Sequence, residues 1–311
     1  MNTHVPTPAA ARPDAKPAPM VGVDVGGTFT DLFFFDAAAG TFRTAKVPSN
    51  RGDEAVGFLE GLKTFGPVAQ LGSIVHGTTV GTNALLERKG ARTALITTRG
   101  FRDVLEMRRR DRLHTWGLWG DFVPVIDREL RFEVDERILA DGSVRQGLDV
   151  EQVRAAARQA LAMGAQALAI VFINAYANPA HELAAYAAAR EVWPNDDLAC
   201  SAQILPEIRE FERTSTTALN AYLQPVVGSY LAKLDGALHS EGFTGRFHIV
   251  QSSGGVMSTA TARSIPPAIT ARENPVCRAT CLVMAKTFSP RRSPSARSRR
   301  AFSVTASRSR T

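Results

Sequence analysis

Short apolar runs separated by glycines and polar residues predict the first elements of the chain. Two β-rich runs, 21–25 and 31–35, flank the stretch 26–30, which opens with two glycines. This order is typical of a β-hairpin, because glycine supplies the backbone freedom that a tight turn requires. Helical spacing of apolar residues then covers 79–88 and stops before Gly90, which predicts a helix ended by a C′ glycine.

The middle of the chain alternates strand and helix patterns. Asp149 precedes a helical pattern over 150–163, and an aspartate at this place is a favoured N-cap. Further segments of the same alternation are predicted as strands over 93–97, 166–172 and 198–202 and as a helix over 179–192. Helices alternating with buried strands indicate an α/β protein.

The pattern changes beyond Leu205. One long helix is predicted over 214–239, interrupted near Pro225, and a strand over 246–251 leads into a loop that ends in Gly254 and Gly255. The organisation predicted from these changes is a disordered Pro/Ala-rich arm at 1–19, a first region at 20–204, a second region at 205–276 and an anomalous Ser/Arg-rich tail at 277–311.

The charge of the chain is concentrated in that tail. The 311 residues hold 37 Lys and Arg against 30 Asp and Glu, a net charge of +7. The tail holds nine of the basic residues and no acidic residue, so residues 1–276 carry −2, that is 7 − 9. A basic pI normally suggests an acidic partner. For the mildly acidic body we instead expect no nucleic-acid partner and no membrane partner.

Cysteine usage and hydropathy indicate the compartment. No apolar run reaches the roughly 18 residues that a membrane span requires. Two of the three cysteines, Cys277 and Cys281, lie in the tail, so only Cys200 remains in the body. A body with one cysteine has no disulfide framework, which favours the reducing cytoplasm.

The most specific chemical motif runs from Val23 to Asp31 and reads VDVGGTFTD. A Gly-Gly turn after a buried strand lets backbone N–H groups approach phosphate oxygens, and threonine hydroxyls add donors. An aspartate on a core strand is costly to bury alone, so Asp24 is expected to face a cleft with a metal or a reacting group. The motif lacks the spacing of a dinucleotide fingerprint and the lysine of a Walker A loop. An ordinary hairpin in which the aspartate caps the turn is the alternative.

Two further polar clusters are candidates for binding. Residues 76–83, HGTTVGTN, stand at the start of a predicted helix, where free N–H groups and hydroxyls attract anions; the alternative is a threonine N-cap beside a loop histidine. Residues 205–217, LPEIREFERTSTT, are suited to a small polar substrate, with Glu207 or Glu212 as acid or base. For that cluster the alternative is a solvated, salt-bridged helix start. The six histidines have no metal-ligand spacing, and therefore no zinc site is predicted.

Taken in order, these motifs resemble the ATP-dependent hydantoinase/oxoprolinase family, in particular its A-type subunit. The resemblance runs from about Met20 to Val276. It rests on six segments in the family order, namely 23–31, 77–90, 97–103, 176–182, 205–217 and 251–255. Six motifs in sequence are much more specific than one glycine loop, which favours the phosphate-binding interpretation of the first motif.

The resemblance implies an actin/Hsp70/sugar-kinase-like ATPase fold, present here as the first lobe and the start of a second region. ATP and Mg²⁺ are the implied cofactors, and a B-type subunit is the implied partner. The family chemistry uses ATP to open a five-membered cyclic amide, a hydantoin or 5-oxoproline. Phosphorylation of the amide oxygen makes a stable amide reactive, and clamping of the phosphoryl group supplies most of the catalysis.

The resemblance also assigns residues. Asp24 is expected to be catalytic and to organise Mg²⁺ through water molecules. The expected phosphate contacts are Gly26, Gly27, Thr28 and Thr30. The expected substrate contacts are Thr78, Thr79, Asn83, Arg209, Glu212 and Arg213.

The tail departs from the family pattern, because no second Asp-x-Gly-Gly-Thr motif follows Val276. Its composition is that of a GC-rich coding sequence in the wrong reading frame, so we expect a frameshift near Cys277 and a longer true protein. Three alternatives remain open: a subunit of an ATP-dependent ketone carboxylase, an inactive truncated remnant that binds no ATP, and a nucleic-acid-binding protein that uses the tail.

Overall fold

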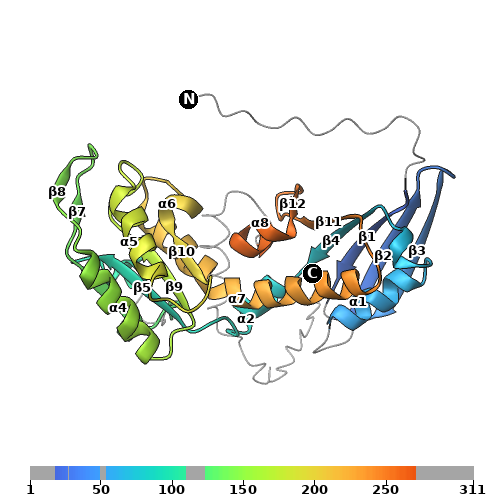
Figure 1. Ribbon diagram of the computed structural model, residues 1–311, viewed down its shortest axis with the longest axis horizontal. Helices are drawn as coiled ribbons and strands as arrows, with labels where there is room; N and C mark the ends of the chain where they lie inside the picture. The colour runs from blue at the N-terminus through green and yellow to red at the C-terminus, as the bar shows by residue number, and fades with distance from the viewer. Residues whose placement is uncertain (1–17, 27, 50–53, 110–122, 271–311) are drawn as a thin grey trace, which may run out of the picture.

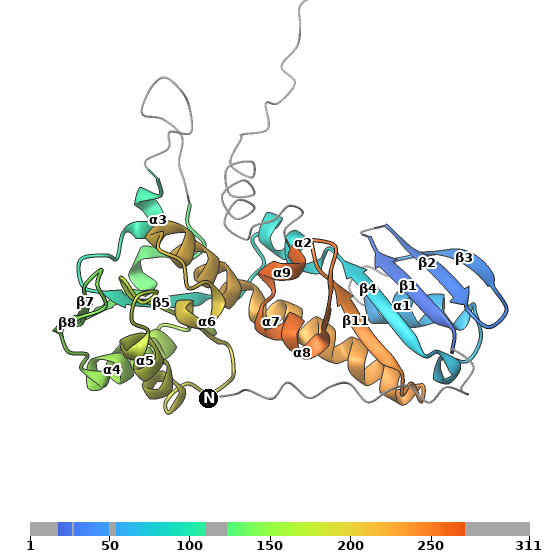
Figure 2. The same cartoon turned by 90° about the horizontal axis from the view of Figure 1, so that it is seen from above.

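The structure is a computed structural model that describes residues 18–26, 28–49, 54–109 and 123–270. Two β-sheets stand at opposite ends of the long helix α7 (Glu210–Ser240), as Figures 1 and 2 show. The expected α/β class is confirmed. Each sheet has its own hydrophobic core, and α7 contributes side chains to both.

The sheet of the N-terminal segments has six strands in the order β12-β11-β4-β1-β2-β3. Their bounds are β1 Met20–Val25, β2 Phe29–Asp36, β3 Thr41–Pro48, β4 Ser73–Thr78, β11 Arg246–Val250 and β12 Val256–Ser258. The first three strands form an antiparallel meander, whereas β4 and β11 run parallel to β1. Segments about 220 residues apart in the chain therefore share one sheet.

One face of this sheet is covered and the other is open among the described residues. Val21, Val23 and Val25 alternate inward and are buried, packing with α1 (Glu54–Lys63) and α7 in one core. The intervening side chains, Asp24 among them, point to the opposite, open face. The candidate site lies on the open face and at the strand ends beside it.

The second sheet has four parallel strands in the order β10-β9-β5-β6. Their bounds are β5 Thr93–Thr98, β6 Arg131–Val134, β9 Ala167–Val171 and β10 Leu198–Cys200. All residues of β5 and β9 are buried, because α4 (Val150–Ala162) and α5 (Ala180–Arg190) pack with these strands and α7 covers the remaining face. The predicted Asp149 cap is confirmed, since its Oδ1 accepts the Glu151 N–H at 2.9 Å.

The remaining elements are short. They are α2 Val80–Leu86, α3 Val104–Met107, α6 Ser201–Ile204, α8 Thr259–Ser264, α9 Pro267–Thr270, the 3₁₀ turns Val68–Gln70 and Arg128–Leu130, and the hairpin β7 Arg137–Ile138 with β8 Val144–Gln146. Across the described ranges, no helix is both long and apolar enough to cross a bilayer.

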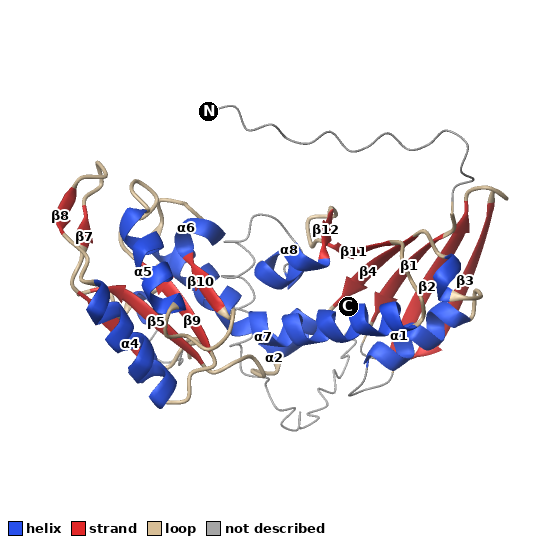
Figure 3. Ribbon diagram, viewed as in Figure 1, coloured by secondary structure: helices blue, strands red, loops and turns tan. Residues whose placement is uncertain are grey.

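The long helix α7 differs from its prediction in one respect. The expected interruption near Pro225 is wrong, because the helix runs through this residue for 31 residues in all, as the blue ribbon in Figure 3 shows. Proline removes only one backbone hydrogen bond from a helix. Residues 211–223 are buried without a break, and this packing against two cores holds the helix together despite the missing bond.

The end of helix α2 also differs from the prediction. Gly90 is not the left-handed residue that ends this helix, because Arg88 takes that conformation with φ 57° and the Lys89 N–H bonds the Ala84 carbonyl at 2.8 Å. Gly90 serves a different purpose. A Cβ at this position would lie 2.1 Å from the ring of buried Tyr222, so the close approach of α7 requires a glycine.

Candidate active site

Three parallel strands bring the predicted motifs to one edge of the six-stranded sheet. In the register of β1 and β4, Val25 lies beside Thr78, and Ile249 of β11 lies beside His76. The carboxyl ends of parallel strands meet at the same edge. The glycine turn after β1, the threonines after β4 and the loop 251–255 after β11 therefore share this edge, although the sequence separates them widely.

Hydrogen bonds within the turn between β1 and β2, and from Ser49 and Thr30, fix its shape. The Gly26 N–H donates to the Phe29 carbonyl at 3.1 Å, and the Ser49 hydroxyl donates to the Gly26 carbonyl at 2.8 Å. Thr30 is 1% exposed, and its hydroxyl bonds that of Ser49 at 3.0 Å. Thr30 thus supports the turn, whereas Thr28 is exposed at its tip. Gly27 lies outside the described residues.

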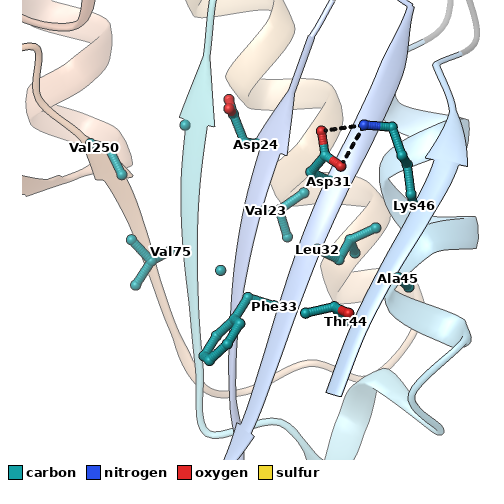
Figure 4. Close-up of a pocket in the computed structure, with 12 residues that line it drawn as sticks. Val23, Asp24, Asp31, Leu32, Phe33, Thr44, Ala45, Lys46, Val75 and Val250 are labelled. Carbon is teal, nitrogen blue, oxygen red and sulfur yellow. Dashed lines mark hydrogen bonds and ion pairs between the residues drawn. The ribbon is translucent and has the colours of Figure 1, made fainter. Parts of the chain in front are cut away.

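Asp24 belongs to a row of side chains that crosses the open face (Figure 4). It stands opposite Asp31 of β2, and Asp31 stands opposite Lys46 of β3. The Lys46 ammonium bonds the two Asp31 oxygens at 2.9 and 3.2 Å. On the other side of Asp24 lies Gly77, where a Cβ would be only 3.3 Å from the Asp24 Oδ1.

This row forms one end of a groove of about 720 Å³ on the open face. Gly22 and Gly77 leave its floor without side chains, and Phe33, Val75 and Val250 are among its apolar lining residues (Figure 4). Asp24, Asp31 and Lys46 supply the charged end. The groove therefore combines a glycine floor with a carboxylate that solvent can reach.

The charges of the row suit a cation. Two carboxylates directly opposite each other on neighbouring strands repel, and among the described residues the ion pair of Lys46 is with Asp31 and not with Asp24. Mg²⁺ is commonly held by one or two carboxylates together with water and phosphate oxygens, so exposed Asp24 with Asp31 beside it fits this ion. A cage of three or more acidic, histidine or cysteine ligands is absent from the described part of the chain.

The second predicted cluster is split by the structure. Thr78 Oγ1 accepts the Val80 N–H at 3.2 Å, and Thr79 Oγ1 accepts an Asn83 side-chain N–H at 3.3 Å. These three groups stay at the same edge as Asp24. The alternative of a loop histidine is wrong, because His76 lies in β4 and is fully buried, with its Nε2 2.8 Å from the Tyr230 hydroxyl.

The third predicted cluster lies elsewhere, at the start of α7. Arg209 is exposed, whereas the Glu212 side chain is 3% exposed and forms an ion pair with Arg109. The alternative of a solvated helix start is thus wrong for residues 211–217, all of which are buried. Glu212 and Tyr230 are 18 residues apart, roughly 27 Å along the helix axis. The structure does not bring this cluster to the glycine turn.

Arg213 is the most deeply buried charge of that cluster. It is 0% exposed, and one of its terminal nitrogens donates to the Phe172 carbonyl at 2.5 Å. Its Nε and Nη1 have no hydrogen-bond partner within the described segments. Burial lowers the pKa of this guanidinium, while nearby Glu182 opposes the change.

Comparison with known proteins identifies the family. Residues 20–193 match the hydantoinase/oxoprolinase N-terminal region, and residues 213–289 match the hydantoinase/oxoprolinase domain. This chain belongs to the hydantoinase/oxoprolinase family. The resemblance deduced from the six motifs is thereby confirmed.

Individual relatives in this family differ in the reactions their names describe. The chain is 33% identical to the caprolactamase subunit alpha of Pseudomonas jessenii, over 76% of this chain and 36% of the relative. It is 30% identical to 5-oxoprolinase 1 of Arabidopsis thaliana, over 68% of this chain and 19% of the relative. The chain thus spans well under half the length of these curated relatives.

Two solved structures of the family share the fold. Nucleotide-free acetone carboxylase superposes with a TM-score of 0.68 at 27% identity, over 82% of this chain and 39% of that one. The ATP-dependent caprolactamase of Pseudomonas jessenii gives a TM-score of 0.73 at 32% identity, over 80% and 38%. The mixed α/β arrangement is therefore shared with experimentally determined members of the family.

Several residues of the site were missed by sequence reasoning. Ser49, Asp31 and Lys46 were not assigned a role, and Lys46 and Ser49 belong to β3 or its end, which was not predicted. Alternation of polar and apolar residues over 44–47 is the signal that was available. The pairing of β3 with β2 then follows from the hairpin rule, and it is this pairing that places Lys46 beside Asp31.

Proposed function

We propose that this chain forms the nucleotide-binding part of an ATP-dependent enzyme that opens a five-membered cyclic amide, a hydantoin or 5-oxoproline. In this proposal the six-stranded sheet is a lobe of an actin/Hsp70/sugar-kinase-like fold. The observation that carries it is the meeting of the glycine turn, the threonines after β4 and the loop 251–255 at one strand edge, beside exposed Asp24. Such an edge is the usual ligand position in sheets with parallel strands.

The residues divide into binding and supporting roles. Backbone N–H groups at Gly27 and Thr28 would hold the phosphates. Gly26, whose N–H bonds the Phe29 carbonyl, and Thr30, which acts through Ser49, would keep the turn in shape. Asp24, with Asp31 beside it, would hold Mg²⁺ and its waters. ATP, when bound, supplies the phosphoryl group that makes the amide carbonyl reactive. The chain itself would position the phosphates at the glycine turn.

Relatives support the reaction class and also a second candidate. Both the caprolactamase and the 5-oxoprolinase are named for reactions on cyclic amides. The acetone carboxylase structure supports the alternative of an ATP-dependent ketone carboxylase. Because the relatives carry long regions beyond the matched part, full activity is proposed to require such a region and a B-type subunit. The cytoplasm is the proposed compartment, since Cys200 is a buried free thiol.

Nucleotide binding tests the proposal. We expect isothermal titration calorimetry to detect Mg²⁺-ATP binding by the 311-residue chain, and Asp24→Asn to weaken it by about tenfold or more, because charged contacts are the strong ones. Asp127→Asn is the matched control, since Asp127 is exposed and lies outside the site. Equal affinity of Asp24→Asn and wild type would refute the site, and absence of binding by wild type would favour the inactive remnant.

Hydrolysis then separates the reaction classes. ATP turnover is measured with and without a B-type subunit, in the presence of hydantoin, 5-oxoproline or a ketone. Stimulation by hydantoin or 5-oxoproline is the expected result. If ATP turnover rises with a ketone and bicarbonate but not with either cyclic amide, the ketone carboxylase replaces the proposed hydrolase.

A further inference from the structure

The groove on the open face has a second row of residues, which the proposed nucleotide site does not use. Gly22 of β1 stands opposite Phe33 of β2 and beside Val75 of β4. Phe33 in turn stands opposite Thr44 of β3, and all four residues line the groove. Gly22 comes two residues before Asp24 on the same strand, a span of about 7 Å. This second row therefore lies close to the carboxylate that is proposed to hold Mg²⁺.

Packing does not explain the glycine in this row. A glycine inside a strand is unfavourable relative to alanine, and it often marks a place where a ligand or another backbone approaches closely. Beyond the adjoining residues, a Cβ at Gly22 would have only the Phe33 carbonyl oxygen within 4 Å among the described atoms, at an ordinary contact distance of 3.9 Å. At Gly61, by contrast, a Cβ would lie 2.8 Å from the Leu32 side chain. The space above Gly22 is thus free for a ligand.

Apolar side chains stand on both sides of this free space. Phe33 is 49% exposed although it lies in the middle of β2, and its ring stacks on that of Phe42 with centroids 5.8 Å apart. Val75 lies on the other side of Gly22 and also lines the groove (Figure 4). Neighbouring strands are about 4.8 Å apart, so the Cα atoms of Phe33 and Val75 are separated by roughly 10 Å. A small planar ring between them would cover apolar surface that is open to solvent.

The charges of the groove indicate which ring suits this space. The charged residues that line it are Asp24, Asp31 and Lys46, all in the first row. The Lys46 ammonium is bonded by both Asp31 oxygens. The second row offers only the Thr44 hydroxyl as a polar side chain. A ligand carboxylate in this row would therefore lose water without gaining a cation, whereas an uncharged ring would not.

We infer that the cyclic amide lies over Gly22, between Phe33 and Val75, and that the groove prefers an uncharged ring such as hydantoin to one that carries a carboxylate, such as 5-oxoproline. The reacting carbonyl then points along the strand toward Asp24. One groove thus holds the phosphate end of the nucleotide and the amide side by side, as phosphoryl transfer between them requires. The inference rests on the proposed function for the reaction, and it adds the position and the charge of the substrate.

Three ligands test the preference for an uncharged ring. Hydantoin, 5-oxoproline and its neutral amide, 5-oxoprolinamide, are titrated calorimetrically into the 311-residue chain with Mg²⁺ and a non-hydrolysable ATP analogue, whose own binding is measured first. We expect hydantoin and 5-oxoprolinamide to bind about tenfold more tightly than 5-oxoproline.

The outcomes separate this inference from the proposed function. Equal or tighter binding of 5-oxoproline overturns the inference, and so does absence of hydantoin binding to a chain that binds the ATP analogue. Failure of the wild-type chain to bind the analogue refutes the proposed function instead, and titration of the three ligands without nucleotide then decides the inference.

Substitution of Gly22 tests the position of the ring. Gly22→Val fills the space above the strand, and we expect hydantoin affinity to fall about tenfold or more while affinity for the ATP analogue stays within about twofold. Gly147→Val is the matched control, because Gly147 is exposed, has open space around it and lies outside the groove. Unchanged hydantoin affinity in Gly22→Val overturns the inference.

A second pair of variants keeps the test decisive if circular dichroism shows that Gly22→Val does not fold. Phe33→Leu removes the aromatic wall of the groove and should weaken hydantoin binding about three- to tenfold. Phe42→Leu breaks the same ring stack, but Phe42 does not line the groove, so hydantoin affinity should remain that of wild type. Equal effects of the two substitutions on hydantoin affinity would overturn the inference.

Discussion

Acidification provides a direct test of the core beneath the candidate site, through His76. The imidazole is fully buried between Phe58 and Phe247, with ring centroids 5.1 and 6.2 Å away. Burial lowers its pKa from 6.5 to about 4, while the hydrogen bond to the Val23 carbonyl opposes the change. The folded state therefore resists protonation that the unfolded state accepts, and stability present above pH 6.5 is lost as the pH falls toward 4.

The magnitude follows from the two pKa values. Between pH 7 and pH 5 the difference in proton binding removes about 2 kcal/mol of unfolding free energy, and the full shift corresponds to about 3 kcal/mol. With a urea m-value of about 2–3 kcal/mol/M, the midpoint should fall by roughly 0.7–1 M. The range above pH 5 is chosen because most carboxylates stay ionised there.

The assay is urea unfolding followed by circular dichroism at pH 7 and pH 5. Wild type is compared with the double variant His76→Phe/Tyr230→Phe, which removes the titrating ring and the hydroxyl it bonds, because apolar replacement of both partners is nearly neutral. Between pH 7 and pH 5 we expect the free energy of unfolding of the double variant to fall by about 2 kcal/mol less than that of wild type. Parallel losses in the two proteins would show that His76 is not the responsible group.

Three more outcomes are expected. Glu182→Ala removes the buried acceptor of the Phe172 and Ala202 N–H groups and of the Ser201 hydroxyl. Urea unfolding should show that the free energy of unfolding falls by about 3–5 kcal/mol, and a fall below about 1 kcal/mol would contradict this expectation. Gly90→Ala forces a Cβ against Tyr222 and should cost about 1–3 kcal/mol, whereas Gly236→Ala, with open space in α7, should stabilise by about 0.5–1 kcal/mol. Asp31→Asn should raise the Mg²⁺ concentration needed for ATP binding roughly threefold to tenfold, a prediction that unchanged Mg²⁺ dependence in calorimetry would refute.

Local patterns predicted much of the fold. The hairpin of β1 and β2, the capped helix α4, the buried strand β9 and the helix α5 all lie within a few residues of their predicted bounds. Each of these is determined by its own residues: a glycine turn, an aspartate cap, an unbroken apolar run, an alanine-rich amphipathic pattern. The continuity of α7 through Pro225 was not predictable in this way, since it depends on burial against two cores.

The parts of the candidate site that are encoded by neighbouring residues were predicted, whereas their arrangement in space was not. Asp24 and the glycine turn are encoded within nine consecutive residues, and the Thr78 motif within eight. Their juxtaposition depends on the parallel pairing of β1 with β4, which no local pattern encodes. Arg209, Glu212 and Arg213 looked equivalent in sequence, yet only Arg209 is exposed. The position of Gly22 between Phe33 and Val75 likewise exists only in the fold.

The unbroken path of α7 has a mechanical consequence. Helix α7 packs Ala218 and Ala221 in the core of one sheet and Leu231 and Leu234 in the core of the other. Rotation of the four-stranded sheet relative to the six-stranded sheet would bend this helix, and a helix bends most easily where a backbone hydrogen bond is missing. That place is Pro225, which leaves the Ala221 carbonyl without its usual donor. A bend of α7 would therefore cost least at Pro225.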